Sequence, residues 1–247
     1  MLNEKLTIIV PTFGRPKFVE RVVQYSNLFG LKVVIADGSP KSLDIETIRA
    51  IEKSKHIKYF RDKSDMPARI KNAAKIVQTD FCMCMADDDL FLPSGLSAAI
   101  EKLVLDRSAV ACMGQALGFD VIYGKRYFFN YGNSLKNYQL RHDNPAERLK
   151  LGIKKCRSVA FYAVFRTQDF RLIWRNIESS CCPEQIEYEH AICTFYQGNV
   201  ITSDKVYWLR SFEAEPVSSD EAGKRNINFA YWYTNNDFCR EVNAFNI

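Results

Sequence analysis

Long hydrophobic runs are missing from this sequence. No stretch of about 18 consecutive apolar residues, the least that a membrane-spanning helix needs, occurs anywhere in the chain. The opening residues, MLNEKLTIIVPTFG, also lack the long apolar centre and the small-residue cleavage site of a secretory signal. We therefore expect no membrane-spanning helix, and we expect the protein to be cytoplasmic.

Patterns of cysteine and histidine that bind metals are also missing. The chain has eight cysteines and three histidines, but it has no CxxC pair and no set with the spacing of a zinc site. In the cytoplasm, cysteines of this kind are expected to be reduced thiols of the core. These absences argue against a zinc module and against a disulfide scaffold.

Blocks of one charge are missing as well. The formal net charge of +5 arises from 34 Lys and Arg against 29 Asp and Glu, scattered along the chain. A scattered excess does not indicate a nucleic-acid partner, but it suits a phosphate-bearing substrate or an anionic membrane surface. Ordinary globular composition, with 47% hydrophobic and 26% charged residues and no repeat or Gly/Ser linker, predicts a single domain over residues 1–247.

Strands and helices alternate in the first half of the chain. Strands are predicted at 6–10, 31–40, 56–61 and 81–86, and helices at 16–30, 44–53, 67–77 and 95–106. Such alternation is typical of βαβ units, so the predicted class is α/β, with a Rossmann-like, mostly parallel sheet flanked by helices. The second half is mixed. A hairpin is predicted at 119–131, strands at 157–166 and 200–210, and helices at 145–155 and 184–196.

Polar loops follow three of the predicted strands. Their sequences are Thr12-Phe13-Gly14-Arg15, Asp37-Gly38-Ser39 and Asp87-Asp88-Asp89. In parallel sheets the ligand lies beyond the carboxyl ends of the strands, so these loops are expected to converge on one cleft.

The three adjacent aspartates need a partner, because like charges repel and a carboxylate that leaves water is costly. A strand that ends in aspartates holds a hard divalent cation through one or two oxygens and leaves the other positions to substrate phosphates and water. The alternative is that these aspartates cap the next helix or face water, since Asp is common after strands.

Three segments, TIIVPTFGRP, VVIADGSP and ADDDLFLP, stand in this order in the chain. Together they resemble the nucleotide-sugar half of inverting glycosyltransferases of family 2, which have the GT-A fold. The resemblance implies a nucleotide-sugar-binding half at 1–115 and an acceptor-side half at 116–247. It also implies a hexosyltransferase-like enzyme with a D-x-D motif that binds Mn²⁺ or Mg²⁺ across the diphosphate of the donor.

The resemblance also implies roles for single residues. It puts Pro11, Thr12 and Arg15 at the nucleotide, Asp37 on the base or ribose, and Asp88 on the metal. Two further aspartates are close helpers, Asp87 at the donor and Asp89 at the metal, and the motif can also be read directly as Asp87-x-Asp89.

The segment MPARIKNAA loosely resembles the family's Ala-Arg-Asn run beside the nucleotide. It makes Arg69 or Lys71 a candidate for a phosphate contact, and a solvated helix face is the alternative.

An inverting transfer needs a carboxylate that takes the proton of the acceptor hydroxyl. The segment CCPEQIEYEHAICTFYQGNV resembles the later Glu-Asp segment of the family, although the expected Asp is absent. Counting back from Gly198 makes Glu187 the candidate base, with Glu184 and Glu189 as rivals.

These observations favour a transferase that moves a sugar, from a UDP-sugar by preference, to a hydroxyl of a glycan or lipid-linked glycan. The resemblance implies bacterial surface polysaccharide synthesis, with a peripheral membrane contact at the inner face. Two alternatives stay open, a degenerate module that binds a sugar nucleotide without turnover and a sugar nucleotidyltransferase. The aromatic run 229–233, FAYWY, is a candidate for stacking on a sugar, for membrane contact or for packing on the sheet.

Overall fold

The computed structural model describes residues 2–131, 135, 138–154, 158–178 and 182–213. The aromatic run 229–233 lies outside the described residues. The first half of the chain forms the elements α1 (Leu2–Lys5), β1 (Leu6–Thr12), α2 (Pro16–Phe29), β2 (Lys32–Asp37), α3 (Ile45–Lys53), β3 (Ile57–Arg61), α4 (Met66–Ile76), β4 (Phe81–Cys84), β5 (Leu90–Phe91) and α5 (Pro93–Leu105). The second half forms β6 (Ala109–Ile122), β7 (Lys125–Tyr131), α6 (Pro145–Lys154), the 3₁₀ helix η2 (Ser158–Tyr162), β8 (Val164–Arg166), α7 (Thr167–Arg175), α8 (Pro183–Gln197) and β9 (Asn199–Ser211).

The first four strands form the predicted parallel sheet. β1 pairs in parallel with both β2 and β4, and β3 pairs in parallel with β2. β1, β2 and β4 are short apolar runs that are buried on both faces, as central parallel strands must be, whereas β3 lies at the edge and is partly exposed. The helices between them start and stop at local signals: the Asp44 and Asp65 side chains cap α3 and α4, and α2 ends at Gly30 in the left-handed region with φ 62°.

One sheet continues into the second half in the order β3-β2-β1-β4-β8-β6-β9-β5. β8 joins β4 and β6 by antiparallel pairing, whereas β9 runs parallel to β6. β6 and β7 form the predicted hairpin, and its turn residues Tyr123 and Gly124 both have positive φ. β6 also crosses the predicted boundary between residues 115 and 116, and the division into two functional halves stays a prediction.

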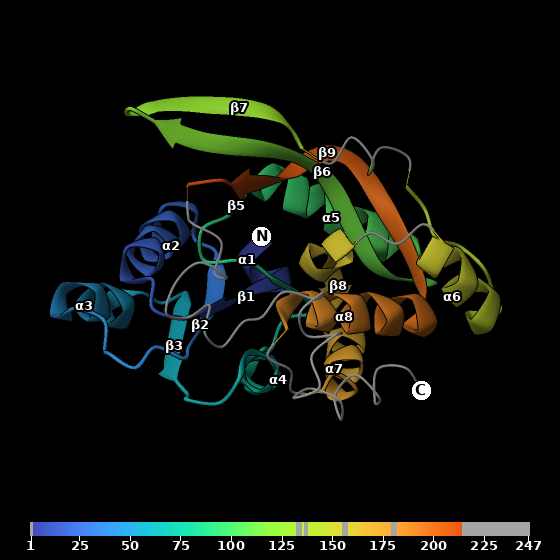
Figure 1. The fold of residues 1–247 in the computed structure, drawn as a ribbon, viewed down its shortest axis with the longest axis horizontal. Helices are drawn as coiled ribbons and strands as arrows, with labels where there is room; N and C mark the ends of the chain where they lie inside the picture. The colour runs from blue at the N-terminus through green and yellow to red at the C-terminus, as the bar shows by residue number, and fades with distance from the viewer. Residues whose placement is uncertain (1, 132–134, 136–137, 155–157, 179–181, 214–247) are drawn as a thin grey trace.

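Helices cover the sheet in two groups. α2 contacts α3, and these two helices lie together at the left of Figure 1, while α4, α7 and α8 pack against one another in the lower part. α5 packs against β6 and β9 behind the sheet, and the β6–β7 hairpin extends along the top of the view. The fold is therefore α/β, with helices flanking a sheet that is parallel at its N-terminal side and mixed beyond it.

The prediction of one strand over 157–166 is wrong for most of its length. Residues 158–162 form η2, and only Val164–Arg166 is a strand. The reason is tertiary packing: the Phe161 ring lies 5.6 Å from Trp174, and the Tyr162 ring stacks 4.6 Å from Trp208. A short helical turn sends consecutive aromatic side chains to two different neighbours. The helix α7 and the short elements α1 and β5 were not predicted.

Candidate active site

Side chains from the loops after β1 and β4 bind one another directly. The Thr12 hydroxyl donates to Asp87 Oδ2 at 2.6 Å. The Arg15 guanidinium, at the start of α2, donates to Asp87 Oδ1 at 3.0 Å and to Asp88 Oδ2 at 3.1 Å. One arginine therefore joins two carboxylates of the acidic cluster, which supplies the cationic partner that adjacent carboxylates need.

The loop after β2 joins the same place through backbone contacts. Gly38 N donates to the carbonyl of Thr12 at 3.0 Å, and Gly14 N donates to the hydroxyl of Ser39 at 2.8 Å. Gly14 has φ 72°, a conformation that a glycine adopts at little cost. The expectation that three strand-end loops meet is therefore confirmed.

Asp37 is fully buried at the end of β2. Its carboxylate accepts from the Ser39 backbone N–H at 2.7 Å and from the Tyr59 hydroxyl at 2.8 Å. Burial, and then the bond to the Asp37 carboxylate, raise the pKa of Tyr59, so this phenol stays a donor. Both carboxylate oxygens are thus held in place beneath the loop, and the position of Asp37 in the cleft floor is fixed.

Arg69 lies against this loop from α4. The side chain is buried, and a Cβ placed on Gly38 would fall 2.1 Å from Arg69 Nη1, so the loop passes directly over the guanidinium. Burial lowers the pKa of Arg69, and the charge of Asp37 opposes that shift. Arg69 Nη1 donates to the carbonyl of Ser64 at 2.7 Å, while Nε has no hydrogen-bond acceptor among the described residues.

Asp87 is buried and Asp88 more exposed, with 6% and 13% of their side-chain surfaces accessible. Burial raises the pKa of Asp87 to about 6, although the charge of Arg15 and the Thr12 hydroxyl oppose the shift. Arg21 of α2 donates to the backbone carbonyl of Asp88. Neighbouring residues therefore bind both the side chains and the backbone of the loop after β4.

Asp89 turns the other way, into the protein. Its Oδ2 accepts from Trp208 Nε1 at 2.8 Å, its Oδ1 accepts from the Ser211 backbone N–H at 2.9 Å, and Arg210 stands 3.6 Å away. Burial raises the pKa of Asp89 to about 7, with Arg210 opposing and Asp88 adding to the shift. These bonds fasten β9 to the loop after β4, and a metal at Asp89 would compete with them.

Tyr162 links the acidic cluster to the segment of the predicted base. Burial raises its pKa well above the usual range, and among the neighbouring charges Glu187 contributes most, followed by Asp89. Glu187 is half-buried on α8. The charges of the α8 carboxylate and of the β4 loop therefore act on the same phenol.

The rival glutamates face other neighbours. Glu189 is two residues from Glu187, which places it on the other side of a helix. Burial raises the pKa of Glu189; its side chain accepts from Gln185, and the nearby charges are those of Glu178 and Lys71. Glu184 is exposed beside the thiol of Cys182, which donates to it at 3.5 Å. Of the three, Glu187 is the one whose charge acts on Tyr162 together with the acidic cluster.

The carboxylate of Asp88 suits a hard cation. Arg15 donates to Asp88 Oδ2, and no described residue donates to Asp88 Oδ1. No group of three or more His, Cys, Asp or Glu side chains that would hold a metal occurs within the described ranges. Oxygen donors from one or two carboxylates fit Mg²⁺ or Mn²⁺, which takes its other ligands from phosphates and water.

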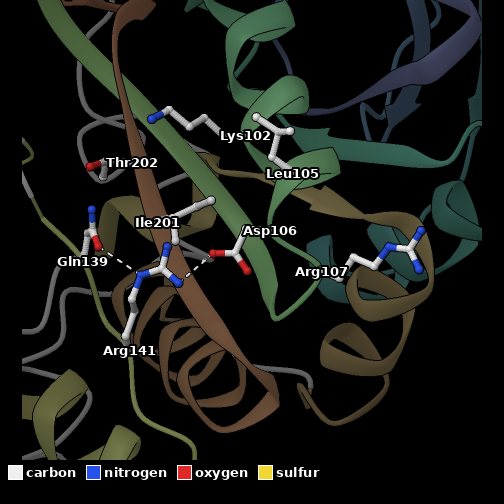
Figure 2. Close-up of a pocket in the computed structure, with 8 residues that line it drawn as sticks. All are labelled: Lys102, Leu105, Asp106, Arg107, Gln139, Arg141, Ile201 and Thr202. Atoms are coloured by element: carbon white, nitrogen blue, oxygen red, sulfur yellow. Dashed lines mark hydrogen bonds and ion pairs between the residues drawn. The ribbon is translucent and has the colours of Figure 1, made fainter.

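A separate cavity of about 400 Å³ lies at the far end of α5 (Figure 2). Its lining residues include Lys102, Arg107 and Arg141, and the last of these pairs with Asp106 at 2.6 Å. The aspartate cluster precedes the start of α5, and a helix of 13 residues is about 20 Å long. This cavity therefore contains none of the candidate site residues.

Several residues of the cleft were missed by sequence reasoning: Arg21, Tyr162, Trp208 and Arg210. Trp208 and Arg210 alternate along β9, and this period of two places both side chains on one face of the strand. That signal was readable, but their partner Asp89 is 119 residues from Trp208 in the chain. Only the fold brings them together.

The model of the family described as glycosyl transferase family 2 matches residues 7–174, which is more than half of the 247 residues. The chain belongs to glycosyl transferase family 2. The match covers the three strand-end loops and ends within α7, before the α8 segment of this family 2 glycosyltransferase.

Solved structures of S. aureus TarS resemble the family 2 glycosyltransferase described here. TarS 1–349 in complex with UDP-GlcNAc has a TM-score of 0.62 at 13% identity, covering 90% of this chain and 64% of that chain. TarS 1–349 without a named ligand has a TM-score of 0.57 at 14% identity, covering 84% and 60%. At such identity the likeness shows the fold, so the predicted GT-A fold is confirmed.

This glycosyltransferase spans less than two thirds of each of these TarS chains, and 36% of the longer TarS structure. No protein with a curated function matches it. Among the described residues, no helix has both the length and the apolar character needed to cross a membrane.

Proposed function

We propose that this glycosyltransferase moves a sugar from a nucleoside diphosphate sugar to a hydroxyl of a glycan, with inversion at the transferred carbon and with Mn²⁺ or Mg²⁺. The observation that carries the proposal is the meeting of Arg15, Asp87 and Asp88 at the ends of β1 and β4. The cationic side chain there suits the negative phosphates of a metal-bound diphosphate, and the carboxylates suit its cation. The S. aureus TarS structures determined with UDP-GlcNAc and with UDP support a uridine nucleotide as donor.

Each cleft residue has a part in donor binding. Asp88 holds the cation through the oxygen that no described residue engages, and Asp87 stays bound to Thr12. Arg15 and Arg69 supply positive charge for the phosphates. Asp37 is buried with both carboxylate oxygens bonded, so in place of the predicted direct contact it positions the loop after β2 beside the base or ribose. Pro11 shapes the loop at the end of β1. The bound cation would stabilise the charge that develops on the leaving diphosphate.

Glu187 acts as the general base in this proposal. Its charge and that of Asp89 both raise the pKa of Tyr162, which supports a place for Glu187 near the acidic cluster. An inverting transfer takes the hydroxyl proton at the face opposite the leaving group, and a carboxylate in that position accepts it. Asp89 positions the β4 loop through Trp208 and Ser211.

The acceptor in this proposal is a glycan or lipid-linked glycan of a bacterial surface polysaccharide. The enzyme would then work in the cytoplasm, with a peripheral contact at the inner face of the membrane. The small positive net charge of +5 supports attraction to an anionic leaflet.

Calorimetry tests the donor site. UDP, GDP, CDP and ADP are titrated into the full chain with Mn²⁺ and with EDTA, and the same titrations are run on Asp88→Ala. We expect one diphosphate to bind only with metal, and we expect Asp88→Ala to abolish that binding. Asp204→Asn, an exposed aspartate of β9, is the matched control and should bind as the wild type does. Binding that ignores both metal and Asp88 would make the acidic cluster structural.

A further inference from the structure

A strip of aromatic rings leads away from the acidic cluster. Tyr162 stacks on Trp208 at 4.6 Å, and Trp208 meets Tyr131 edge-on at 5.5 Å. Tyr131 meets Phe212 at 5.8 Å, and Phe212 meets Phe129 at 5.0 Å. The strip starts in the protein, where Trp208 is 1% exposed, and ends at the surface, where Phe212 is 46% and Phe129 is 42% exposed.

The register of three strands places these rings on one face. Tyr131 of β7 and Trp208 of β9 are both paired with Ala116 of β6, and Phe129 is paired with Gly118. Side chains two residues apart share a face, so Tyr127, which is 47% exposed, extends the strip by one more ring.

Small residues on the middle strand make room for the rings. A Cβ on Gly118 would fall 2.2 Å from the ring of Phe129, so the ring lies directly over the backbone of β6 at this point. The opposite face of the hairpin is different, because Phe119 there is buried at 6% exposure and Arg21 of α2 lies over its ring. On that face Phe119 is packed on the body and Phe128 is exposed, whereas the strip face carries a continuous row of rings that runs to the surface.

The strip is continuous with the proposed catalytic residues. Trp208 donates to Asp89, which follows Asp88 in the chain. The exposed rings therefore begin next to a buried tryptophan that is bonded to the acidic cluster.

We infer that the strip formed by Tyr127, Phe129, Tyr131 and Phe212 binds the acceptor glycan chain and directs its end hydroxyl to the cleft. The inference rests on the proposed function and adds a binding surface to it. Pyranose rings have an apolar C–H face that packs on the negative face of an aromatic ring, and the two phenol hydroxyls bond to sugar hydroxyls. The exposed rings end next to Trp208, the partner of Asp89, so they suit a chain of sugars whose end must reach the proposed reacting groups, whereas a bilayer has no need of that position.

Binding of glycans to the full chain tests this inference. Labelled wild type, with UDP and Mn²⁺ present, is applied to immobilised hexasaccharides of glucose, N-acetylglucosamine, galactose, mannose and rhamnose. We expect at least one to bind, and we expect F129A/F212A to bind it about tenfold more weakly. The matched control is F128A, which removes the neighbouring, 59% exposed phenylalanine of the opposite face and should leave binding unchanged.

UDP and Mn²⁺ titrations of each variant separate this inference from the proposed function. Unchanged UDP binding in F129A/F212A shows that the variant is folded, and weaker glycan binding by the same variant supports the inference. If the double variant does not fold, Tyr127→Ala takes its place. Binding of no hexasaccharide by the wild type overturns the inference, as does equal weakening by F128A. It is also overturned if the double variant loses phosphatidylglycerol-vesicle binding or self-association while glycan binding stays unchanged. Loss of UDP binding in the wild type would instead overturn the proposed function.

Discussion

Each aspartate of the cleft has an arginine close by. Arg15 binds Asp87 and Asp88, and Arg210 stands by Asp89. A buried charge requires such pairing, because an unpaired carboxylate at these positions would lose its hydration without gaining the attraction of a cation. The two arginines thus offset part of the negative charge of the three carboxylates.

Glu187 and Glu189 form a matched pair for a test of the catalytic base. We expect Glu187→Gln to lower kcat by about 10²–10⁴-fold, because the amide cannot take a proton. Glu189→Gln should change kcat little, since its neighbours are Gln185, Glu178 and Lys71. The measurement is donor turnover with an acceptor, with UDP binding as the control for donor-site integrity. Equal losses in both variants would contradict the assignment.

His190 is a buried side chain with two polar ring nitrogens. Neither ring nitrogen has a hydrogen-bond partner in the described part of the chain, and the rings of Phe161, Phe165 and Trp174 lie 5.2–5.3 Å away. We expect His190→Leu to raise the free energy of unfolding by about 1–3 kcal/mol at pH 8, because an unsatisfied polar group is removed. Urea denaturation measures this, and His190→Gln, which keeps polar atoms at the site, should not stabilise.

The pH dependence of His190→Leu gives a second readout. Burial lowers the pKa of His190 to about 3. A depressed pKa contributes stability that is present above the unfolded value of about 6.5 and is lost as pH falls towards 3. The advantage of the leucine variant should therefore grow as pH falls below about 6.5. An advantage that is constant from pH 8 to pH 5 would show that His190 is not buried as described.

The residues proposed for the donor side could be named from the sequence because acidic side chains coincide there with a local strand pattern. Asp37 and Asp87 each follow a short apolar run, and strand ends in a parallel sheet share an edge. Arg210 and Trp208 had no such marker, since their roles depend on a contact with Asp89 from a distant strand.

Elements that depend on local signals were predicted well, and those that depend on packing were not. α3 and α4 begin at Asp caps, and their predicted ranges are confirmed. η2 was predicted as a strand, because an apolar aromatic run has no local feature that separates a buried strand from a packed turn. The parallel pairing of β6 with β9 joins segments far apart in the chain.

Gly95 allows the helix α5 to lie close to the backbone of β9. A Cβ on this residue of α5 would fall 2.2 Å from the carbonyl oxygen of Val206 and 2.6 Å from Tyr207 Cα. Ala normally stabilises a helix relative to Gly by about 1 kcal/mol. Here we expect Gly95→Ala to destabilise by about 1–3 kcal/mol, because β9 backbone must move. Thermal and urea unfolding measure it.

The exposed neighbour Ser94 provides the control for that substitution. Ser94→Ala adds helix propensity without entering the α5–β9 contact, so its effect should be small and stabilising. If Gly95→Ala stabilised the protein as Ser94→Ala does, α5 and β9 would not be as close as described.

At the scale of the whole molecule, the cleft makes stability depend on pH and on ligand. Burial raises the pKa of Asp87 to about 6 and that of Asp89 to about 7, above the unfolded value of about 3.9. A raised folded pKa contributes stability that is full below the unfolded pKa and is lost as pH rises through the folded one. The stability of the unliganded protein therefore falls as pH rises from about 4 to about 7, because Asp87 and Asp89 lose their protons within the folded protein.

We expect stability without ligand to fall as pH rises, and we expect the stabilisation by ligand to grow as pH rises. In EDTA, the difference in unfolding free energy between the wild type and Asp89→Asn should change between pH 5 and pH 8, with the wild type losing stability more steeply as pH rises. His190 is the same in both proteins, so its contribution cancels. UDP with Mn²⁺ should raise the midpoint of thermal unfolding more at pH 8 than at pH 5.5, because Asp87, beside the proposed metal ligand Asp88, attracts a cation more strongly when it is ionised. Parallel pH curves for the two proteins would mean that Asp89 is not buried as described, and a ligand effect that is larger at pH 5.5 would mean that Asp87 does not face the bound cation.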